Sequence, residues 1–212
     1  MEILLSTNNQ GKIDRFKKLL KHIDSGIKLH SPKELGIKVF QVEELGATLA
    51  ENAELKARAY FAKTDMPILS NDTGFYVEGE GFVIAPKREA LGEFGQKILT
   101  EKEIAEKLLN FWKGVASKHG GEVSAAWIES FAVIYPDGNI KRADCRREII
   151  LTNREFGKSH IHMPIRALYY SKTTNKPAIQ HTEEEEILEM KPVIEALTEI
   201  LKISKNGSWK KS

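Results

Sequence analysis

The sequence predicts an α/β fold with a mixed β-sheet, and three observations lead to this prediction. An apolar segment at residues 3–5 precedes a helical pattern, and a second helical pattern precedes another apolar segment at residues 68–70. Later, residues 127–135 and 140–151 are rich in strand-forming residues and flank a Pro-Asp-Gly-Asn turn. Strand–helix alternation is typical of parallel pairing, whereas a hairpin is antiparallel, so a sheet holding both is mixed.

The first strand and helix span roughly residues 2–24. Residues 3–5 predict a short buried strand, and a polar loop containing Gly11 leads from it into the helix. The apolar residues that recur at helical spacing are Ile13, Phe16, Leu19, Leu20 and Ile23.

A second helix is predicted from Thr48, because Thr48 and Glu51 match a capping box. We expect it to end near Lys63, before Met66 and Pro67. The strand at residues 68–70 is expected to break at residues 71–74 and to resume at residues 75–77.

Two more helices are indicated in the second half. Thr100 and Glu103 form another capping box, which opens a helix with an apolar face. Pro192 suits the first turn of a last helix. The apolar positions of these two helices are Ile104, Leu108, Phe111, Trp112 and Val115, then Val193, Leu197, Ile200 and Leu201.

Length and composition exclude several classes of protein. The chain has 212 residues, enough for one large domain or two small lobes. No apolar run approaches the roughly 18 residues that cross a bilayer, and the N-terminus lacks the pattern of a signal peptide. The single cysteine, Cys145, excludes an internal disulfide and fits a plain packed residue. A net charge of +2 is too small to drive non-specific nucleic-acid binding. We therefore expect a cytoplasmic protein without a membrane or nucleic-acid partner.

The first polar segment of interest is residues 7–12, at the point where the predicted first strand ends and the predicted first helix begins. It contains Thr7, Asn8, Asn9, Gly11 and Lys12. Unpaired N–H groups at a helix N-terminus favour an anion. Gly11 allows close approach of a ligand, and Asn8, Asn9 and Lys12 add donors and a positive charge. The segment fits either a phosphate site or an ordinary helix cap with a surface lysine, and it is not a Walker loop.

The second polar segment leads into the helix at Thr48. Glu44 lies just before Gly46, where a carboxylate can turn into a cleft. Thr48, Asn52 and Lys56 are spaced four apart, so they share one helical face. This face is either part of a site or an exposed polar surface.

The third segment contains Asp72, within Ser-Asn-Asp-Thr-Gly at a strand end, where α/β folds usually carry their sites. An Asx turn at a strand break is the alternative. Together, Glu44 and Asp72 form a pair suited to Mg²⁺, which takes one or two carboxylates, waters and substrate phosphate oxygens.

Three motifs occur in order along residues 2–80: Thr7-Asn8-Asn9-x-Gly11-Lys12, Glu44-x-Gly-x-Thr48-x-x-Glu51-Asn52-Ala53-x-x-Lys56-Ala57 and Asn71-Asp72-Thr73-Gly74. Together they resemble the inosine/xanthosine triphosphate pyrophosphatase family, which removes non-standard purine nucleotides. The resemblance implies an elongated α/β fold with a twisted mixed sheet flanked by helices, and two lobes around a central cleft. It also implies a homodimer that uses Mg²⁺ to cleave nucleoside triphosphates into monophosphate and pyrophosphate.

By position, the resemblance implies roles for individual residues. Residues 7–12 and Lys56 would hold the phosphates, and Glu44 would hold the metal. Asp72 would act at the metal and activate the water, with Thr73 beside the substrate. Asp72, Lys12 and Lys56 are thus the candidate catalytic residues, and Asn52 is a further candidate contact.

The second half departs from that family. Its Phe-Gly-Tyr/Trp-Asp-Pro segment is replaced here by Phe156-Gly157 and then Lys-Ser-His-Ile-His-Met-Pro. Its Ser-His-Arg triplet is replaced by residues 189–192, and its Pro-Gly-x-Tyr segment by residues 81–88. Since the base-reading motifs are changed, an altered base preference is expected. Phe156, together with Lys87 and Arg88, is kept as a candidate substrate contact.

His160 and His162 alternate across Ile161, so on a strand they would point the same way. They fit contact with a base or phosphate, half of a zinc site without an evident third ligand, or an ordinary surface role. The acidic run at residues 183–186 is interpreted as a solvated surface beside a helix.

The whole sequence therefore predicts one two-lobed domain over residues 1–203, with a flexible tail at residues 204–212. The predicted function is Mg²⁺-dependent nucleotide pyrophosphohydrolysis. Two alternatives stay open: an enzyme like the related Maf-like pyrophosphatases, and a catalytically silent nucleotide-binding protein.

Overall fold

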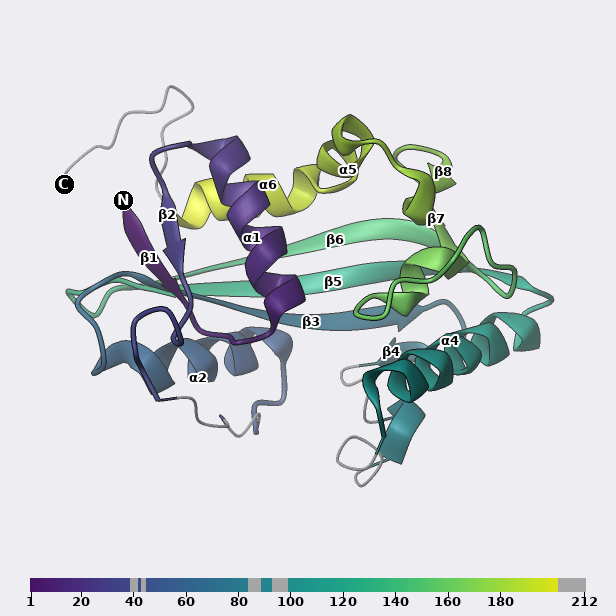
Figure 1. Cartoon of the computed structure of the whole chain (residues 1–212), viewed down its shortest axis with the longest axis horizontal. Coiled ribbons are helices and arrows are strands. Elements are labelled where there is room, and N and C mark those ends of the chain that lie inside the picture. Colours follow the sequence, from purple (N-terminus) through teal and green to yellow (C-terminus); the bar gives the residue numbers. More distant parts are fainter. Residues whose placement is uncertain (39–41, 43–44, 84–88, 93–98, 202–212) are drawn as a thin grey trace. The chain divides into compact units, whose positions relative to one another are not determined.

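The sheet of this chain mixes parallel and antiparallel pairs, as the sequence predicts (Figure 1). The structure is a computed structural model, and it describes all residues except 39–41, 43–44, 84–88, 93–98 and 202–212. Within the described residues the eight-stranded sheet has the order β2-β1-β3-β5-β6-β7-β8, with β4 paired to β3. The mixed α/β fold, a twisted sheet flanked by helices, is confirmed.

The strands are β1 (Glu2–Leu5), β2 (Lys28–His30), β3 (Ile68–Val77), β4 (Gly81–Val83), β5 (Glu122–Ile134), β6 (Ile140–Thr152), β7 (Tyr169–Ser171) and β8 (Lys176–Pro177). The helices are α1 (Gln10–Ile23), α2 (Leu49–Phe61), α4 (Glu101–Lys118), α5 (Glu183–Glu189) and α6 (Lys191–Ile200). Two short 3₁₀ helices are η1 (Pro164–Leu168) and η2 (Ala178–Gln180).

Strand β1 pairs in parallel with β2 and with β3, so that Leu4 lies opposite His30 on one side and Ile68 on the other. The pairs β3–β4, β6–β7 and β7–β8 are antiparallel. The predicted turn between β5 and β6 is also present: the Tyr135 N–H donates to the Asn139 carbonyl, and Gly138 supplies a positive φ of 83°.

The chain divides into two compact units. The first comprises residues 1–73, 129–145 and 192–212, and the second comprises residues 74–128 and 146–191. Strands β3, β5 and β6 each contribute residues to both units.

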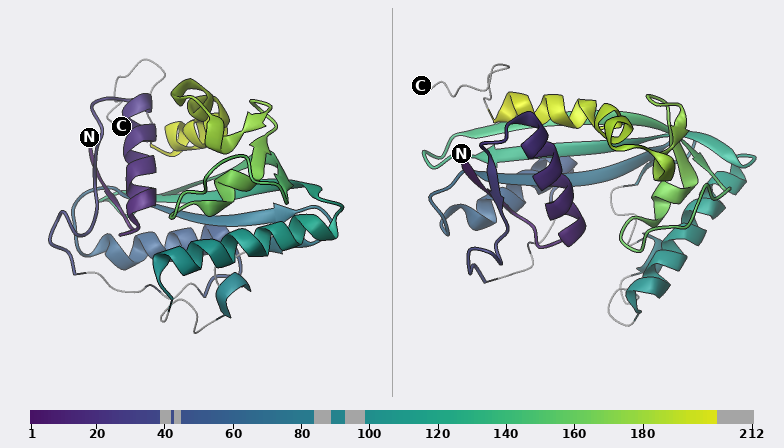
Figure 2. Two further views of the ribbon diagram at one scale, coloured as in Figure 1. Left: turned by 45° about the vertical axis from the view of Figure 1, so that its right-hand side comes forward. Right: turned by 45° about the horizontal axis from the view of Figure 1, so that its top comes forward.

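The first unit carries helices α1 and α2 and most of α6. Helix α1 lies beside β2 (Figure 2). The predicted capping box at Thr48 and Glu51 is present, and α2 ends at Phe61, slightly before the expected residue, because the chain turns there. Pro192 does lie in the first turn of α6. One core cluster of this unit consists of Leu4, Ala57, Tyr60, Ile68 and Ile134.

Strand β3 corrects one prediction. We expected a break at residues 71–74, but the strand is continuous from Ile68 to Val77. The side chains explain why polar residues are tolerated there. The Asn71 amide donates to the Ser130 carbonyl at 3.4 Å, and Lys56 pairs with Asp72, so these buried groups have partners without interrupting the strand.

The core of the second unit is aromatic. Phe75 packs against Trp112 of α4 and Trp127 of β5, with ring centroids 4.6 Å apart in both cases. Helix α4 begins with the predicted capping box of Thr100 and Glu103, and η1 packs against it.

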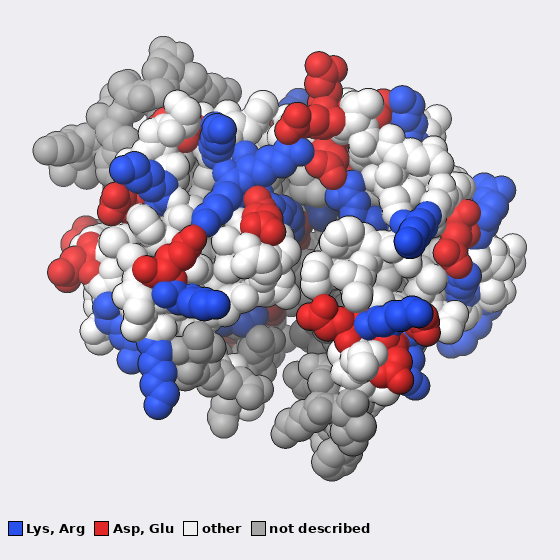
Figure 3. All heavy atoms as spheres, viewed as in Figure 1, with Lys and Arg blue, Asp and Glu red and all other residues white. Residues whose placement is uncertain are grey.

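In the described part of the structure, no helix is both long and apolar enough to cross a membrane. Basic and acidic side chains are interspersed on the face drawn in Figure 3, in line with the net charge of +2. The predicted tail, residues 204–212, lies outside the described residues.

Candidate functional site

Lys12 is set in place by the cap of α1. The Asn9 Oδ1 atom accepts a hydrogen bond from the Lys12 backbone N–H at 3.1 Å, and the Thr7 hydroxyl accepts one from the Asn9 N–H at 3.3 Å. The Lys12 ammonium then donates to the backbone carbonyl of Asn71 in β3 at 3.4 Å. The helix start proposed from the sequence therefore brings Lys12 to the third motif.

The surroundings lower the pKa of Lys12 to about 8. Burial of the ammonium is the main cause, and the positive charge of Lys56 adds to it. The charges of Asp72 and Glu129 act in the opposite direction, while Arg15 lowers the pKa slightly further. An anion bound at this ammonium would raise the pKa again.

Lys56 reaches the same place from α2. Its ammonium donates to the Asp72 Oδ1 atom at 2.6 Å, and Asp72 is buried. The other carboxylate oxygen of Asp72, Oδ2, is buried and has no hydrogen-bond partner among the described residues. A buried carboxylate oxygen without a partner is costly, so this atom is well suited to a cation.

Asn52 is buried against the loop that precedes α2. Its Oδ1 atom accepts a hydrogen bond from the Gly46 N–H at 2.9 Å. A Cβ at Gly46 would lie 2.7 Å from Asn52 Oδ1 and from the Glu51 Cβ, so only glycine fits. Asn52 thus fixes the backbone at Gly46. The predicted metal ligand Glu44 lies outside the described residues.

Asn71 connects the elements of this site. Its side-chain amide donates to Glu129 Oε2 at 3.3 Å, and its Oδ1 atom accepts from the Thr73 hydroxyl at 3.1 Å. Thr73, predicted to lie beside the substrate, is thereby oriented by Asn71.

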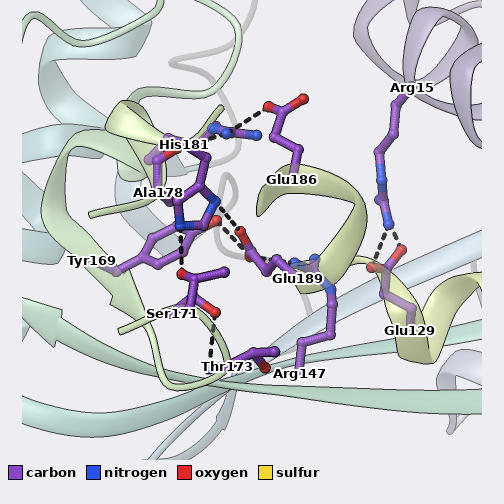
Figure 4. Close-up of polar contacts among 12 residues, drawn as sticks. Arg15, Glu129, Arg147, Tyr169, Ser171, Thr173, Ala178, His181, Glu186 and Glu189 are labelled. Atoms are coloured by element: carbon purple, nitrogen blue, oxygen red, sulfur yellow. Dashed lines mark hydrogen bonds and ion pairs between the residues drawn. The ribbon is translucent and has the colours of Figure 1, made fainter. Parts of the chain in front are cut away.

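Two residues of this region, Glu129 and Arg15, were not predicted from the sequence. The Arg15 guanidinium donates two hydrogen bonds to the Glu129 carboxylate, at 2.9 and 2.6 Å, and Figure 4 shows the pair facing each other. Glu129 was detectable as the one charged residue in residues 127–135, which are apolar apart from Glu129, Ser130 and the Tyr135 hydroxyl. No local pattern points from it to Arg15.

Asn8 and Gly11 complete the first segment. The Asn8 side chain hydrogen-bonds the Tyr60 hydroxyl, and burial raises the pKa of that hydroxyl. Among the described residues, a Cβ at Gly11 would meet Asn9 Oδ1 alone, at an ordinary 3.4 Å. Contacts with these residues therefore do not require a glycine at position 11. Close approach of a ligand to the backbone would require one.

The other predicted contacts belong to the second unit. The Phe156 ring packs edge-on against Tyr170, with centroids 6.3 Å apart, and the Arg154 guanidinium lies 5.0 Å from the Phe156 ring centre. The Phe156 carbonyl also accepts a hydrogen bond from the Gln180 side chain at 2.8 Å. Lys87 and Arg88 lie outside the described residues.

His160 and His162 occupy a tight turn rather than the strand considered from the sequence. His160 forms only an isolated bridge with Met163, and the two imidazole centroids are 5.5 Å apart. Over the described ranges, no group of three or more His, Cys, Asp or Glu side chains could hold a metal ion. The structure thus offers the two histidines no third metal ligand within those ranges.

The second unit also contains a buried ionic cluster, shown in Figure 4, which the sequence did not indicate. Glu189, at the end of α5, accepts hydrogen bonds from Arg147 at 2.7 Å and Tyr169 at 3.3 Å, and lies 3.1 Å from the His181 Nδ1 atom. Burial alone would raise the pKa of Glu189, but the close contact with His181 and the charges of Arg147 and Arg166 outweigh it and lower the pKa.

Comparison with known proteins identifies the family. A family model described as the Ham1 family matches residues 3–156. The chain belongs to the Ham1 family. The resemblance seen in the three motifs is thereby confirmed.

Two relatives of this Ham1-family chain are named dITP/XTP pyrophosphatase. The protein from Aquifex aeolicus is 41% identical over 78 residues, which cover 37% of this chain and 36% of that protein. The protein from Malacoplasma penetrans is 32% identical over 142 residues, covering 65% of this chain and 66% of that protein. The chain therefore matches just over a third of the first relative's length and about two thirds of the second's.

Solved structures support the Ham1 fold along nearly the whole chain. The Ham1 protein of Staphylococcus aureus has a TM-score of 0.67 at 25% identity, covering 95% of this chain and 98% of that one. A HAM1 protein from Coxiella burnetii has a TM-score of 0.67 at 22% identity, covering 96% and 100%.

Proposed function

We propose that this Ham1-family chain is a nucleotide pyrophosphatase that hydrolyses nucleoside triphosphates to monophosphate and pyrophosphate. The observation that carries the proposal is the convergence of two lysines, from α1 and α2, on the Asn71–Asp72 segment of β3. The names of the two curated relatives support the same reaction class. The proposal extends to a homodimer, which the resemblance implies, and to a cytoplasmic location, which the composition of the sequence predicts.

We propose Mg²⁺ as the cofactor. Asp72 fits such an ion, because its buried Oδ2 atom has no partner within the described part of the chain and Mg²⁺ takes carboxylate oxygen. Glu44 is proposed as the second carboxylate. When bound, the ion polarises the phosphates and lowers the pKa of a water molecule.

Phosphate binding and proton transfer are assigned to residues of the chain. Lys12, Lys56 and the N-terminus of α1 bind the phosphates and stabilise the charge that develops on their oxygens. Asp72 takes the proton of the attacking water as a general base. Without nucleotide, Lys56 and Asp72 neutralise each other at 2.6 Å, and phosphate oxygens would compete for the Lys56 ammonium. Binding of the triphosphate thus releases the Asp72 Oδ1 atom from the Lys56 ammonium.

We also propose an altered base preference. Glu189, the first residue in place of the family's Ser-His-Arg triplet, is buried and engaged by Arg147, Tyr169 and His181. A side chain held in this way is not available to read a base. The base-reading function must therefore lie on other residues or be weak.

A screen of nucleoside triphosphates with detection of pyrophosphate, with and without Mg²⁺, tests the proposed function. We expect pyrophosphate release that requires Mg²⁺ for at least one purine triphosphate. Tight binding of a triphosphate without any release would instead favour the silent nucleotide-binding protein.

A further inference from the structure

Glu129 is a buried carboxylate for which the proposed reaction has no use. It lies in β5, and its side chain is 0% exposed. Burying an ionised carboxylate is costly unless the group is paired and hydrogen-bonded. A charge at this position therefore needs an explanation beyond filling the core.

Arg15 supplies the pairing charge. It lies on α1, three residues after Lys12, and its guanidinium holds both carboxylate oxygens of Glu129 at 2.9 and 2.6 Å. Two apolar side chains would join α1 to β5 without desolvating charges, often with equal or better stability. Anchoring of the helix alone thus gives no reason for a carboxylate here.

A further hydrogen bond of Glu129 leads to the candidate site. The Glu129 Oε2 atom also accepts from the Asn71 side-chain amide at 3.3 Å. The backbone carbonyl of Asn71 accepts from the Lys12 ammonium at 3.4 Å, and Asp72 is the next residue. Asn71 is held further by donation to the Ser130 carbonyl at 3.4 Å. One buried carboxylate is therefore linked through Asn71 to both Lys12 and Asp72.

We propose that Glu129, held by Arg15, is a positioning residue that fixes Asn71 and thereby orients the Lys12 ammonium and the Asp72 carboxylate. The inference rests on the proposed function, since it assigns a residue to the same site. Glu129 contacts neither the substrate nor the attacking water and acts through Asn71. Its negative charge also offsets part of the effect of burial, which lowers the pKa of Lys12.

The Glu129→Gln variant tests this role, because it keeps the size of the side chain and removes its charge. Misplaced catalytic groups slow the chemical step, so we expect kcat for inosine triphosphate with Mg²⁺ to fall by about tenfold or more, with KM changed by less than about threefold. The side-chain amide resonance of Asn71 in the nucleotide-free protein should also shift. Arg15→Lys, which keeps the charge but loses the two-pronged contact, should cause a smaller loss.

Glu54→Gln is the matched control. Glu54 lies in the same unit and pairs with Arg58 and with Arg142 of β6, an α-helix-to-strand ion pair like that of Glu129. No contact of Glu54 with Asn71 is found among the described residues. We expect this variant to keep its kcat within about twofold, because exposed pairs contribute little.

Three results would overturn the inference: a Glu129→Gln protein with wild-type kcat, an unmoved Asn71 resonance, or an equal loss in Glu54→Gln. If Glu129→Gln does not fold, an unchanged kcat and Asn71 resonance in Arg15→Lys would overturn it. If the wild-type protein hydrolyses no triphosphate, the proposed function fails instead. The Asn71 resonance then still shows whether Glu129 positions this segment.

Discussion

The ammonium groups of Lys12 and Lys56 come from different helices, yet both reach β3 within two consecutive residues. Local motifs were enough to select these lysines and Asp72 from the sequence. Asn71 was part of a quoted motif, but its role as the link between Lys12 and Glu129 depends on tertiary contacts. Arg15 and Glu129 are 114 residues apart, and no local pattern can join residues at that separation.

Removal of either lysine should weaken triphosphate binding far more than nucleoside binding. A hydrogen bond to a charged group contributes about 1.5–3 kcal/mol, so Lys12→Ala and Lys56→Ala should each raise the Kd of a triphosphate by about 10- to 150-fold. Titration calorimetry with triphosphate and nucleoside measures both losses. Lys17→Ala, a change to an exposed lysine on the same helix, is the control. Equal losses for both ligands would place the lysines in the scaffold or at the base.

The lowered pKa of Lys12 predicts proton uptake on binding. Its pKa is about 8 in the free protein, and a bound phosphate raises it. Near pH 8 the free ammonium is partly deprotonated, so binding takes up protons; near pH 6 Lys12 is already charged and contributes none. Calorimetry of a non-hydrolysable triphosphate in buffers of different ionisation enthalpy measures the uptake. Lys12→Arg stays charged, so an equal uptake by this variant at pH 8 would refute the assignment.

For helices and strands, the sequence predicted which segments are helical or extended better than it predicted where each segment begins and ends. Capping boxes and apolar periodicity located α2 and α4, because both signals are local. The continuity of β3 was not predictable, since Asn71 and Asp72 are kept in the strand by partners on other elements. The buried cluster around Glu189 was hidden for the same reason.

The Glu189 cluster should be essential to the second unit. Glu189→Gln removes the buried carboxylate that pairs with Arg147, so we expect a loss of about 3–5 kcal/mol in the free energy of unfolding by urea. Glu148→Gln, which breaks an exposed pair with Arg146 on the same strand, should cost at most about 1 kcal/mol. Equal costs for the two variants would contradict a special role for the cluster.

The ionic cluster around Glu189 also predicts how the stability of the fold depends on pH. The fold lowers the pKa of Glu189, so its contribution to stability is present above the ordinary carboxyl pKa and is lost as pH falls through the folded value. Wild-type stability should therefore decline in acid more steeply than that of Glu189→Gln.

At the scale of the whole molecule, we expect the base preference of this chain to differ from that of the family. A site that hydrogen-bonds one base rejects another strongly, because its buried polar groups are left unpaired. The Ser-His-Arg triplet to which the resemblance assigns this readout is not present in residues 189–192, which read Glu-Met-Lys-Pro. We therefore expect less than about tenfold difference in kcat/KM between inosine and adenosine triphosphates, or a preference for another nucleotide. A hundredfold or greater preference for inosine and xanthosine triphosphates would show that other residues, such as His160, His162 or Lys191, rebuild the base readout.

The central claim is that Asp72, between Lys12 and Lys56, supports release of pyrophosphate from a nucleoside triphosphate. The most direct test is to identify the products that wild-type and Asp72→Asn protein form from inosine triphosphate with Mg²⁺. The control is Asp65→Asn, which changes an exposed carboxylate. We predict equal amounts of monophosphate and pyrophosphate from the wild type and from Asp65→Asn. The folded Asp72→Asn protein should be at least about a hundredfold slower, as expected for a lost general base. Near-normal turnover by folded Asp72→Asn, or release of diphosphate and orthophosphate by the wild type, would contradict the claim.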